Sequence, residues 1–527
     1  MAQQDDGSGR APVVIVRPTT SVTSGVAVTQ KLVGAAVAFG DILRRTFGPN
    51  GLDKMMYKTN GENAITNDGA KIVADLLVKH PAAKAFVQLA ESQENACGDG
   101  VTGCLLFASE LMKEAGRLLE RGVHPLALVE AYQQSMQHTL DVLDERSMTE
   151  VDVDALRAVA KTAMVGKSAD VGGHNLANLL VDAMMTVKES GRPVRAEHVR
   201  MTKRGHDSLQ ETALIRGIVI DKKFDSERTP KISQPSKVLA LTCPLTIQKS
   251  KRDAEIEIER PDQMIAFLDA EEKLIQEKID VLTRSGVKAI FTSKEVDDRI
   301  QHACIDNSIL LVGMMEDDGI EDVAAATGAT LINHLDDVAS ASLGSIQSAL
   351  VEVSEHEDGR RTRLVVEAGP ASGLVTIDVG GGQGAAVEEY IRAMYDALRS
   401  VESVIEDPAT LLGGGSFHTA AALNLREIAE SVSGRQRLAI EGFARALETI
   451  PSTLAMNAGE EQIDTLLQLR AAHRNQSDRF GVCKDGQIGE IEGVLLSSHT
   501  ISHALQAAVE TACGLLRVDQ VISSRGD

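Results

Sequence analysis

The segment Cys97–Gly103 reads Cys-Gly-Asp-Gly-Val-Thr-Gly and places one carboxylate, Asp99, between two glycines. An apolar-periodic segment follows from Cys104 to about Leu119, so the pattern predicts a loop that opens onto a helix N-terminus. Unpaired backbone N–H groups and the positive end of the helix dipole would favour a phosphate there. A neighbouring carboxylate would suit Mg²⁺, which takes oxygen ligands. A capped helix after a tight turn has the same pattern, so the segment alone leaves both interpretations open.

A second carboxylate, Asp68, occupies a similar position. It lies in the turn Asn67-Asp68-Gly69, after a predicted hairpin of residues 54–57 and 64–66 and before a helix predicted to begin near Ala70. A helix predicted over residues 25–46 ends upstream at another dense group of turn residues, at 47–51. Asp68 and Asp99 are therefore each expected in a loop that opens onto a helix N-terminus.

The elements that carry these loops change in type along the chain. Residues 104–145 continue the helical pattern with a break at 122–125, and residues 150–200 are predicted to be helical and then strand-like. Short buried strands then alternate with helices, and the chain is mostly helical again from Val387. This layout predicts an α/β domain inserted into an all-α domain whose two halves meet in space. The predicted strands cover residues 214–220, 238–241, 289–292, 309–312, 364–366 and 375–377.

Composition narrows the class of protein. The chain has 527 residues, enough for two to four domains, and its 43% apolar and 25% charged residues are typical of a globular protein. The formal net charge of −22 argues against nucleic acid or an anionic membrane as the main partner. With 3% aromatic residues and no Trp, aromatic surfaces for stacking bases are not expected.

Cysteine usage and the chain's start predict a cytoplasmic protein. Six cysteines without a C-x-x-C pair predict reduced, mostly buried thiols and no zinc ribbon or redox motif. The polar N-terminus has no apolar h-region, so no signal peptide is expected, and residues 1–19 are expected to be a flexible arm. No uninterrupted run of 18 apolar residues predicts a membrane span.

Other motifs are better explained by ordinary structure. The P-loop pattern GxxxxGK[ST] and the GxSxG elbow are absent from the sequence. Gly380–Ala385 is close to a dinucleotide fingerprint, but no second strand with an acidic residue follows about 20 residues later, so a tight strand-to-helix turn is favoured. His499 and His503 lack the Glu of HExxH and are interpreted as ordinary polar residues.

The acidic run Asp253–Gln276 is amphipathic and carries several apolar residues in an exposed-looking pattern. A helix packed on its own domain and a surface that binds a partner or client protein both fit this pattern, because exposed apolar patches usually mark contact surfaces.

Several segments together resemble the group II chaperonins, the archaeal thermosome and the eukaryotic cytosolic chaperonin. The resemblance extends over about residues 20–522. It rests on motifs in the order and spacing of that family: Phe47-Gly48-Pro49-Asn50-Gly51-Leu52-Asp53-Lys54-Met55, Thr66-Asn67-Asp68-Gly69-Ala70, His80-Pro81-Ala82-Ala83-Lys84, Gly98-Asp99-Gly100, Ala324-Ala325-Ala326-Thr327-Gly328, Gly413-Gly414-Gly415 and Leu516-Arg517-Val518-Asp519.

The resemblance implies a multidomain α and α/β chaperonin fold. It has a helical equatorial ATP-binding domain, a hinge-like intermediate domain and an inserted α/β apical domain that binds clients, with a protrusion at about 245–276. Such subunits form homo- or hetero-oligomeric double rings that enclose unfolded proteins and are driven by ATP and Mg²⁺. The implied ranges are about 20–148 and 402–527 (equatorial), 149–215 and 369–401 (intermediate) and 216–368 (apical).

The resemblance also implies roles for individual residues. Asp99 is similar to the Mg²⁺ ligand of the family. Asp396 resembles the carboxylate that orients or deprotonates the attacking water, Asp68 resembles a second carboxylate near that water, and Lys167 resembles the lysine that senses the γ-phosphate. The nucleotide-binding positions implied in this chain are Gly48, Pro49, Asp99, Gly100, Val101, Thr102, Gly103, Lys167 and Gly414.

The chain departs from the family pattern around the nucleotide. Val101 and Gly103 stand where the family usually has hydroxyl residues, Cys483 replaces an Asp or Asn, and residues 494–501 lack the usual Glu-Pro and Lys. An ATP-driven folding chaperonin is therefore the main hypothesis. A divergent ring subunit with weak or no ATPase, structural or regulatory in a hetero-oligomer, is the alternative, and a dinucleotide-dependent enzyme would rest on residues 380–385 alone.

Overall fold

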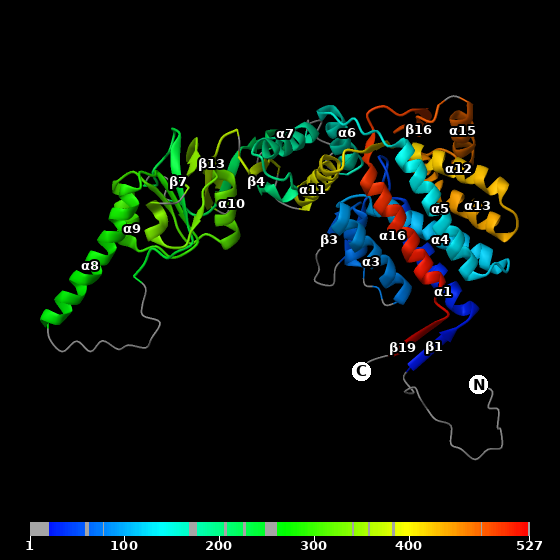
Figure 1. Ribbon diagram of the computed structural model, residues 1–527, viewed down its shortest axis with the longest axis horizontal. Coiled ribbons are helices and arrows are strands. Elements are labelled where there is room, and N and C mark those ends of the chain that lie inside the picture. Colours follow the sequence, from blue (N-terminus) through cyan, green and yellow to red (C-terminus); the bar gives the residue numbers. More distant parts are fainter. Residues whose placement is uncertain are drawn as a thin grey trace, which may run out of the picture. The chain divides into compact units, whose positions relative to one another are not determined.

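The chain folds into two compact units in the computed structural model (Figure 1). The first unit combines Met1–Met148 with Thr410–Asp527, and the second is Thr149–Ala409. The structure describes residues 20–57, 63–76, 78, 80–167, 176–204, 208–224, 228–247, 261–339, 342–356, 359–370, 372–381, 385–475 and 477–524. The expected N-terminal arm, residues 1–19, lies outside these ranges, and the three-domain boundaries stay predictions.

The first unit is a helical assembly around α4 (Val101–Glu120), which contacts α1 (Val26–Arg44), α3 (Pro81–Cys97), α13 (Arg435–Leu447) and α16 (Ser498–Leu516). Its core holds a group of aromatic rings: Phe443 lies edge-on to Phe107 and Tyr132, with ring centroids 5.5 Å and 5.7 Å apart. The remaining helices are α2 (Gly69–Asp75), α5 (Pro125–Arg146), α12 (Ser416–Ser431), α14 (Thr449–Ala458) and α15 (Gln462–Asn475).

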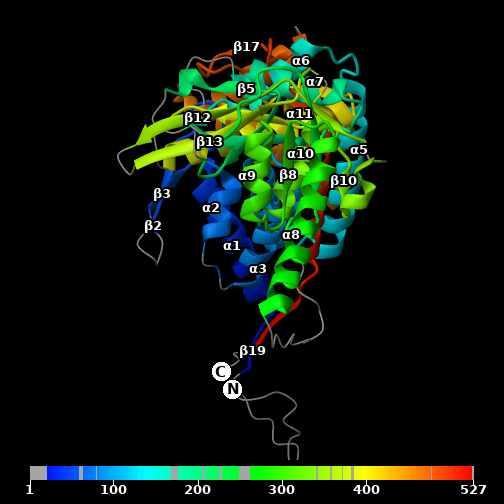
Figure 2. The ribbon, with the colours of Figure 1, turned by 90° about the vertical axis from the view of Figure 1, so that its left-hand side faces the viewer.

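Among its described residues, this unit also contains four antiparallel strand pairs. The pair β1 (Thr20–Ser24) and β19 (Gln520–Ser524) brings the two ends of the described chain together (Figure 2). The pair β2 (Lys54–Tyr57) and β3 (Asn63–Thr66) confirms the hairpin predicted from the sequence. The other two pairs are β15 (Thr410–Leu412) with β18 (Leu495–Ser497) and β16 (Phe480–Val482) with β17 (Ile488–Glu490).

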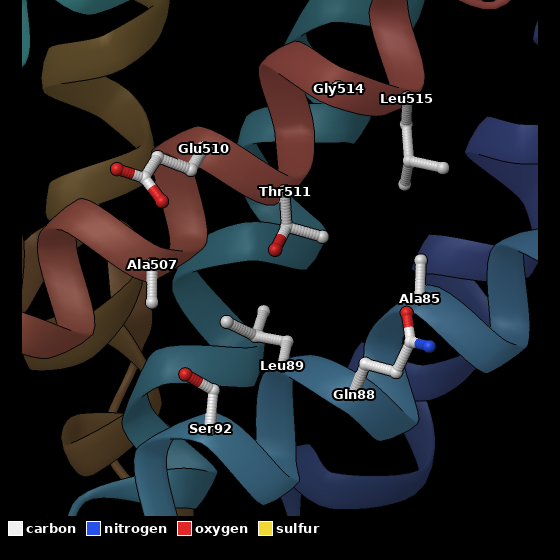
Figure 3. A pocket seen from close by; sticks show the side chains of 9 residues that line it. All are labelled: Ala85, Gln88, Leu89, Ser92, Ala507, Glu510, Thr511, Gly514 and Leu515. Atoms are coloured by element: carbon white, nitrogen blue, oxygen red, sulfur yellow. The ribbon is translucent and has the colours of Figure 1, made fainter. Parts of the chain in front are cut away.

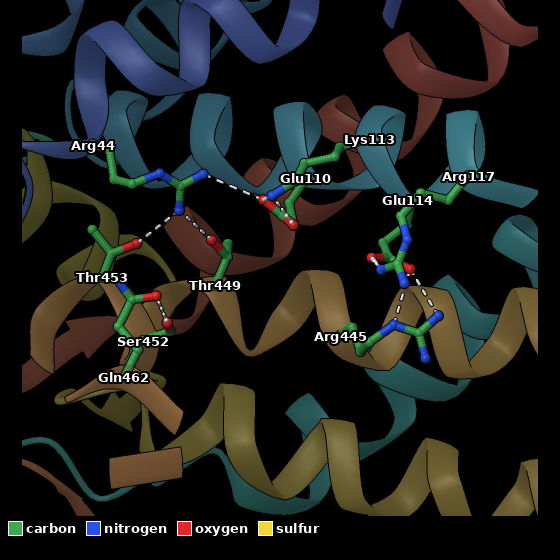
Figure 4. Close-up of polar contacts among 10 residues, drawn as sticks. All are labelled: Arg44, Glu110, Lys113, Glu114, Arg117, Arg445, Thr449, Ser452, Thr453 and Gln462. Atoms are coloured by element: carbon green, nitrogen blue, oxygen red, sulfur yellow. Dashed lines mark hydrogen bonds and ion pairs between the residues drawn. The ribbon is translucent and has the colours of Figure 1, made fainter. Parts of the chain in front are cut away.

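A buried carboxylate fixes the position of α14. Glu448 is 2% exposed and accepts hydrogen bonds from the guanidinium groups of Arg426 on α12 (2.5 Å) and Arg470 on α15 (2.6 and 2.5 Å). Arg44 of α1 adds a second tie, because it donates to the hydroxyls of Thr449 and Thr453 and to Glu110 of α4 (Figure 4). Helices from both halves of the chain therefore converge on α14.

The second unit contains a helical part and two kinds of sheet. Helices α6 (Val153–Met164), α7 (Leu176–Glu189) and α11 (Ala385–Glu406) pack together, and α7 packs on β14 (Val375–Val379). Strand β14 is the centre of a sheet, parallel to β4 (Val199–Lys203) and antiparallel to β5 (Ala213–Ile215). Short 3₁₀ segments lie at Ala196–His198, Leu209–Glu211 and Leu335–Ala339.

A parallel sheet buried on both faces forms the α/β part. Strands β10 (Leu331–Ile332), β7 (Ser236–Leu241), β8 (Ala289–Thr292) and β9 (Leu310–Val312) run parallel, and β11 (Gly344–Ile346) pairs antiparallel with β7. Helix α10 (Asp317–Thr327) packs on one face, and α8 (Pro261–Arg284) and α9 (Asp298–Asp306) pack on the other. Strands β12 (Ser348–His356), β13 (Gly359–Glu367) and β6 (Gly217–Asp221) form an antiparallel sheet beside it.

The expected mixture of α and α/β structure is confirmed, with one correction. The strand predicted over residues 214–220 is two strands, β5 and β6, in different sheets, separated at Arg216. The break occurs beside Gly217, where a Cβ atom would overlap the carbonyl oxygen of Val366. The apolar composition of the stretch therefore predicted a buried strand but did not indicate that the chain passes from one sheet to another there.

Other expectations concern surfaces and thiols. In the described part of the run Asp253–Gln276, helix α8 exposes Met264, Ile265, Phe267 and Leu268, whereas residues 253–260 lie outside the described residues. All six cysteines are free thiols and five are buried, as predicted. Within the described ranges, no helix has the length and apolar character needed to cross a membrane.

The buried His418 on α12 predicts a loss of stability in acid. Burial lowers the pKa of His418 to about 4, so the unfolded chain binds this proton more readily than the folded chain below pH 6.5. The contribution of His418 is complete above pH 6.5 and is lost as the pH falls to about 4, and it amounts to about 3 kcal/mol. Thermal unfolding across this pH range should therefore depend less on pH in His418→Gln. The exposed His138→Gln is the control, and equal pH profiles for wild type and His418→Gln would contradict the assignment.

Removing the charge of Glu448 should destabilise the first unit strongly. Glu448→Gln leaves two guanidinium groups without their shared carboxylate, and breaking a buried ion pair costs roughly 3 kcal/mol or more. The matched control is Glu441→Gln, whose carboxylate pairs with Arg437 at 2.9 Å on the half-exposed surface of α13 and should contribute less than about 1 kcal/mol. Denaturant unfolding of both variants measures the loss in free energy of unfolding. Equal losses would show that the buried ion cluster stabilises the protein no more than the surface ion pair does.

Candidate functional site

The loop before α4 has the geometry that the sequence predicted. Gly98 ends α3 and Gly100 precedes α4, both in the left-handed region with φ of 66° and 81°. The first hydrogen bond of α4 runs from the N–H of Cys104 to the carbonyl of Gly100 (3.0 Å). The N–H groups of residues 101–103 therefore have no partner within the helix, and they give this 20-residue helix an end that is suited to an anion. Asp99 is half-buried immediately before this end.

The Asp68 loop lies against the same helix end. Asp68 caps α2, because its Oδ1 accepts a hydrogen bond from the N–H of Ala70 (3.0 Å). The next residue, Gly69, is so close to α4 that a Cβ atom would overlap the Oγ1 of Thr102. The two carboxylate loops that the sequence placed 31 residues apart (99 − 68) are thus neighbours at the N-terminus of α4.

The loop at residues 47–51 is the third to reach this place. Pro49 lies in a turn closed by a hydrogen bond from the N–H of Gly51 to the carbonyl of Gly48 (3.0 Å). Gly48 has φ of 82°, and the ring of the preceding Phe47 lies 3.4 Å from where a Cβ atom on Gly103 would stand. The loops that carry Gly48, Asp68, Thr102 and Gly103 are therefore brought together at the N-terminus of α4.

Helix α14 supports these loops, and the sequence analysis missed it. Its Ile450 lies 3.8 Å from the Cβ position of Gly103, and its Leu454 contacts Gly48 so closely that a Cβ atom there would overlap it. Its Asn457 donates a hydrogen bond to the carbonyl of Phe47 (2.7 Å). These residues follow a helical spacing, 450, 454 and 457, so one face of α14 forms the support.

Gly414 belongs to a turn on the same support. It has φ of 63°, and a Cβ atom there would stand 2.7 Å from Cδ1 of Ile491 and 3.0 Å from the carbonyl oxygen of Val482. The next residue, Gly415, precedes α12 and would place a Cβ atom 2.7 Å from Pro451 of α14. The glycine turn before α12 thus contacts α14 at Pro451, the residue that follows Ile450.

The two departures in the α4 loop fall at positions that face protein rather than the open helix end. The Val101 side chain is 4% exposed and belongs to the helical core. A side chain at Gly103 would meet Phe47 and Ile450. Thr102 is half-buried and keeps the hydroxyl nearest to the Asp68 loop. The departures therefore leave the backbone donors and Thr102 in place.

The altered stretch at residues 494–501 forms an ordinary helix start. Ser497 caps α16 through a hydrogen bond from the N–H of Thr500 to its Oγ (3.4 Å). His503 is half-buried, and its Nδ1 donates to Oε1 of the buried Gln93 (2.7 Å). Burial and the neighbouring His499 lower the pKa of His503. His503 thus has a structural partner on α3, in keeping with its interpretation as an ordinary polar residue.

The second unit contains the other two predicted residues as a pair. Lys167 follows α6, Asp396 lies on α11, and the Lys167 Nζ is 2.5 Å from Oδ2 of Asp396. Their side chains are 17% and 10% exposed, so water screens this ion pair only weakly. Residues 229 positions apart are brought together because α6 packs on α11. A buried carboxylate beside a cation can orient water or accept a proton.

Other features offer no competing site among the described residues. The described part of the chain contains no group of three or more His, Cys, Asp or Glu side chains that could hold a metal ion by themselves. Mg²⁺ bound beside Asp99 would therefore need further oxygen ligands, which phosphates and water supply. A shallow groove of about 320 Å³ lies between α3 and α16, lined by residues such as Ala85, Gln88 and Ala507, and includes none of the predicted residues (Figure 3). Within the dinucleotide-like segment, residues 382–384 lie outside the described residues.

Comparisons with known proteins agree with these features. The sequence matches the TCP-1/cpn60 chaperonin family over residues 39–525. It is 34% identical over 519 residues to thermosome subunit beta of Methanothermobacter thermautotrophicus, covering 98% of this chain and 95% of the relative. It is 35% identical over 523 residues to thermosome subunit beta of Archaeoglobus fulgidus (98% and 95%) and 34% identical over 531 residues to thermosome subunit alpha of Halobacterium salinarum (99% and 93%). With the family matched over nearly the whole chain, the protein belongs to the TCP-1/cpn60 chaperonins.

Proposed function

We propose that this chain is an ATP-driven chaperonin subunit that encloses and folds unfolded proteins in a double-ring cavity. The observation that carries the proposal is the meeting of the loops of Gly48, Asp68 and Asp99 at the N-terminus of α4. A helix end with free N–H groups, lined by glycines and flanked by carboxylates, is suited to a metal-bound polyphosphate.

The loops of the first unit would bind the nucleotide. The N–H groups of residues 101–103 and the hydroxyl of Thr102 would hold phosphate oxygens, while Gly48, Pro49 and Gly414 would leave room for the rest of the nucleotide. Asp99 would ligate Mg²⁺, which when bound neutralises charge on the phosphates. Asp68 also caps α2, so its carboxylate would be held in a fixed position near the attacking water.

The pair Lys167 and Asp396 would serve the hydrolysis step. Lys167 would turn to the γ-phosphate, and Asp396 would then orient or deprotonate the attacking water. Since these residues belong to the second unit and the phosphate-binding loops to the first, hydrolysis would depend on the conformation of the subunit.

The proposed partners are unfolded client proteins and related ring subunits. The exposed apolar residues of α8 support a client-contacting surface, and the relatives carry the name thermosome subunit. The free thiols support a reducing compartment, so we place the protein in the cytoplasm. Electron microscopy of the purified full-length protein with and without ATP should reveal double rings. A monomeric protein in both conditions would contradict the assembly.

A structural or regulatory ring subunit with weak ATPase is the second candidate. It is favoured by Val101, Gly103 and Cys483 and by residues 494–501, which lack the Glu-Pro and the Lys usual in the family. The burial of Val101 weighs against it, because a hydroxyl at that position would point into the core. Titration of the purified subunit with Mg·ATP separates the two, since tight binding and turnover are expected only for the first.

Neutralising Asp396 should abolish turnover while leaving nucleotide binding. Asp396→Asn keeps the size of the side chain but removes the base, and general-base catalysis typically contributes at least about 100-fold. We therefore expect kcat for phosphate release to fall roughly 100-fold, with Mg·ATP affinity within about 3-fold of wild type in a calorimetric titration. The control is Asp407→Asn, an exposed carboxylate just after α11. Full turnover by Asp396→Asn would refute the assigned role.

Substitutions at Thr102 and Val101 should have different effects on Mg·ATP binding. Thr102→Val removes a hydroxyl at the loop and should weaken Mg·ATP binding by about 10-fold, the typical effect of one hydrogen bond to a charged group. Val101→Thr, which adds a hydroxyl in the buried core, should lower thermal stability without strengthening binding. If Val101→Thr instead bound Mg·ATP about 10-fold more tightly, the missing hydroxyl would be a true defect and the weak-ATPase candidate would be favoured.

A further inference from the structure

Gln93 is a polar residue on the most buried face of α3. It follows Phe86, Leu89 and Ala90 at helical spacing, and its exposed fraction is 0%. A buried amide is costly unless its donors and acceptor are all paired, so its presence at a position suited to an apolar residue requires a reason.

Both N–H donors and the carbonyl oxygen of this amide are used. Its Nε2 donates to the carbonyl oxygen of Asp99 (2.9 Å) and to that of Thr500 (3.3 Å), and its Oε1 accepts from Nδ1 of His503 (2.7 Å). The opposite orientation of the amide would put its oxygen against two carbonyl oxygens. The side chain is therefore fixed in one direction by three partners on two elements.

The contact with Asp99 falls at the peptide that matters for the candidate site. The carbonyl of Asp99 belongs to the peptide that leads into Gly100 and then into the free N–H groups of α4. A Cβ atom on Gly100 would stand 3.0 Å from Cγ2 of Thr500 and 3.3 Å from Nε2 of Gln93, so this peptide is clamped closely from the side of α16. Fixing this peptide constrains the backbone from which the Asp99 side chain and the following N–H groups project.

We propose that Gln93 is a positioning residue that holds the Asp99–Gly100 peptide in the conformation needed for Mg²⁺ and phosphate, with His503 of α16 holding Gln93. Gln93 acts through the backbone of Asp99 and not by touching the nucleotide. The proposal rests on the proposed nucleotide site. It assigns to the C-terminal helix a part in binding, because two of the three partners of Gln93 belong to α16.

A purely structural role for Gln93 would give a different result. If the amide only joined α3 to α16, its loss would lower stability and leave the metal dependence of binding unchanged. If it positions Asp99, its loss would raise the Mg²⁺ concentration needed for nucleotide binding. Leaving the Asp99 carbonyl without this hydrogen bond should raise that Mg²⁺ concentration about 10-fold, the typical effect of one unsatisfied buried group.

The test uses the full-length protein with Gln93→Met, which keeps the side-chain length but removes the donors and acceptor. Mg²⁺ titration in the presence of a fluorescent ATP analogue should give a half-saturation concentration about 10-fold above wild type. The matched control is Gln88→Met, an exposed residue of α3 that lines the groove in Figure 3, and it should stay within about 2-fold.

A second variant protects the test against misfolding. His503→Ala leaves Gln93 in place but removes its anchor, so half-saturation should rise by a smaller factor, about 3-fold. The double variant should show less than the product of the two effects, because both act through one network. The proposal would be opposed by an unchanged metal dependence in folded His503→Ala, and equally by a double variant whose effect is the full product of the two single effects.

Hydrogen exchange of the nucleotide-free protein separates this proposal from the proposed function. In Gln93→Met the peptide spanning residues 98–104 should exchange about 10-fold faster than in wild type, whereas the peptide of α5 should be unchanged. If wild type bound no Mg·ATP, the proposed function would fail while the exchange result still tested the clamp. If Gln93→Met matched Gln88→Met in both exchange and Mg²⁺ dependence, Gln93 would be structural only and the proposal would be overturned.

Discussion

The interaction on which the candidate site depends is the buried contact of Glu448 with Arg426 and Arg470. A carboxylate that is 2% exposed has lost its hydration, so it stays in place only while both guanidinium groups compensate it. This contact holds the start of α14 against α12 and α15. Because one face of α14 carries Ile450, Leu454 and Asn457, the same contact determines where the glycine loops lie. The geometry of the candidate site thus depends on an ion cluster that lies outside the site itself.

The site is built from backbone more than from side chains, and this explains how the chain tolerates its departures. Gly48, Gly100 and Gly414 all have positive φ, and side chains at these positions would also strike Leu454, Thr500 or Ile491. The N–H groups at the start of α4 exist whatever residues follow Gly100. Val101 and Gly103 therefore lack side-chain oxygens but leave the N–H groups of the helix end in place. Substitution is therefore more restricted at these glycines than at Val101 and Gly103.

Local patterns in the sequence predicted the helices, the hairpin of β2 and β3, and the two loops that open onto α2 and α4, because caps and turns depend on adjacent residues. The support by α14 could not be predicted, since it joins residues about 400 positions apart and its face has no unusual composition. The division of residues 214–220 into two strands was missed because both strands are apolar. Gln93 left a usable signal: a polar residue at helical spacing after Phe86 and Leu89 marks a buried amide that needs partners.

The pair Lys167 and Asp396 adds a condition that follows from electrostatics alone. The two charged groups are 2.5 Å apart and little exposed, so separating them costs free energy that a new partner for either charge would offset. An arriving phosphate would offer Lys167 such a partner and thereby release Asp396, whereas a neutral molecule would not. On the proposed roles, the carboxylate becomes free to orient water only when a phosphate is present. The same ion pair that stabilises the packing of α6 on α11 would then prevent the base from acting on an empty site.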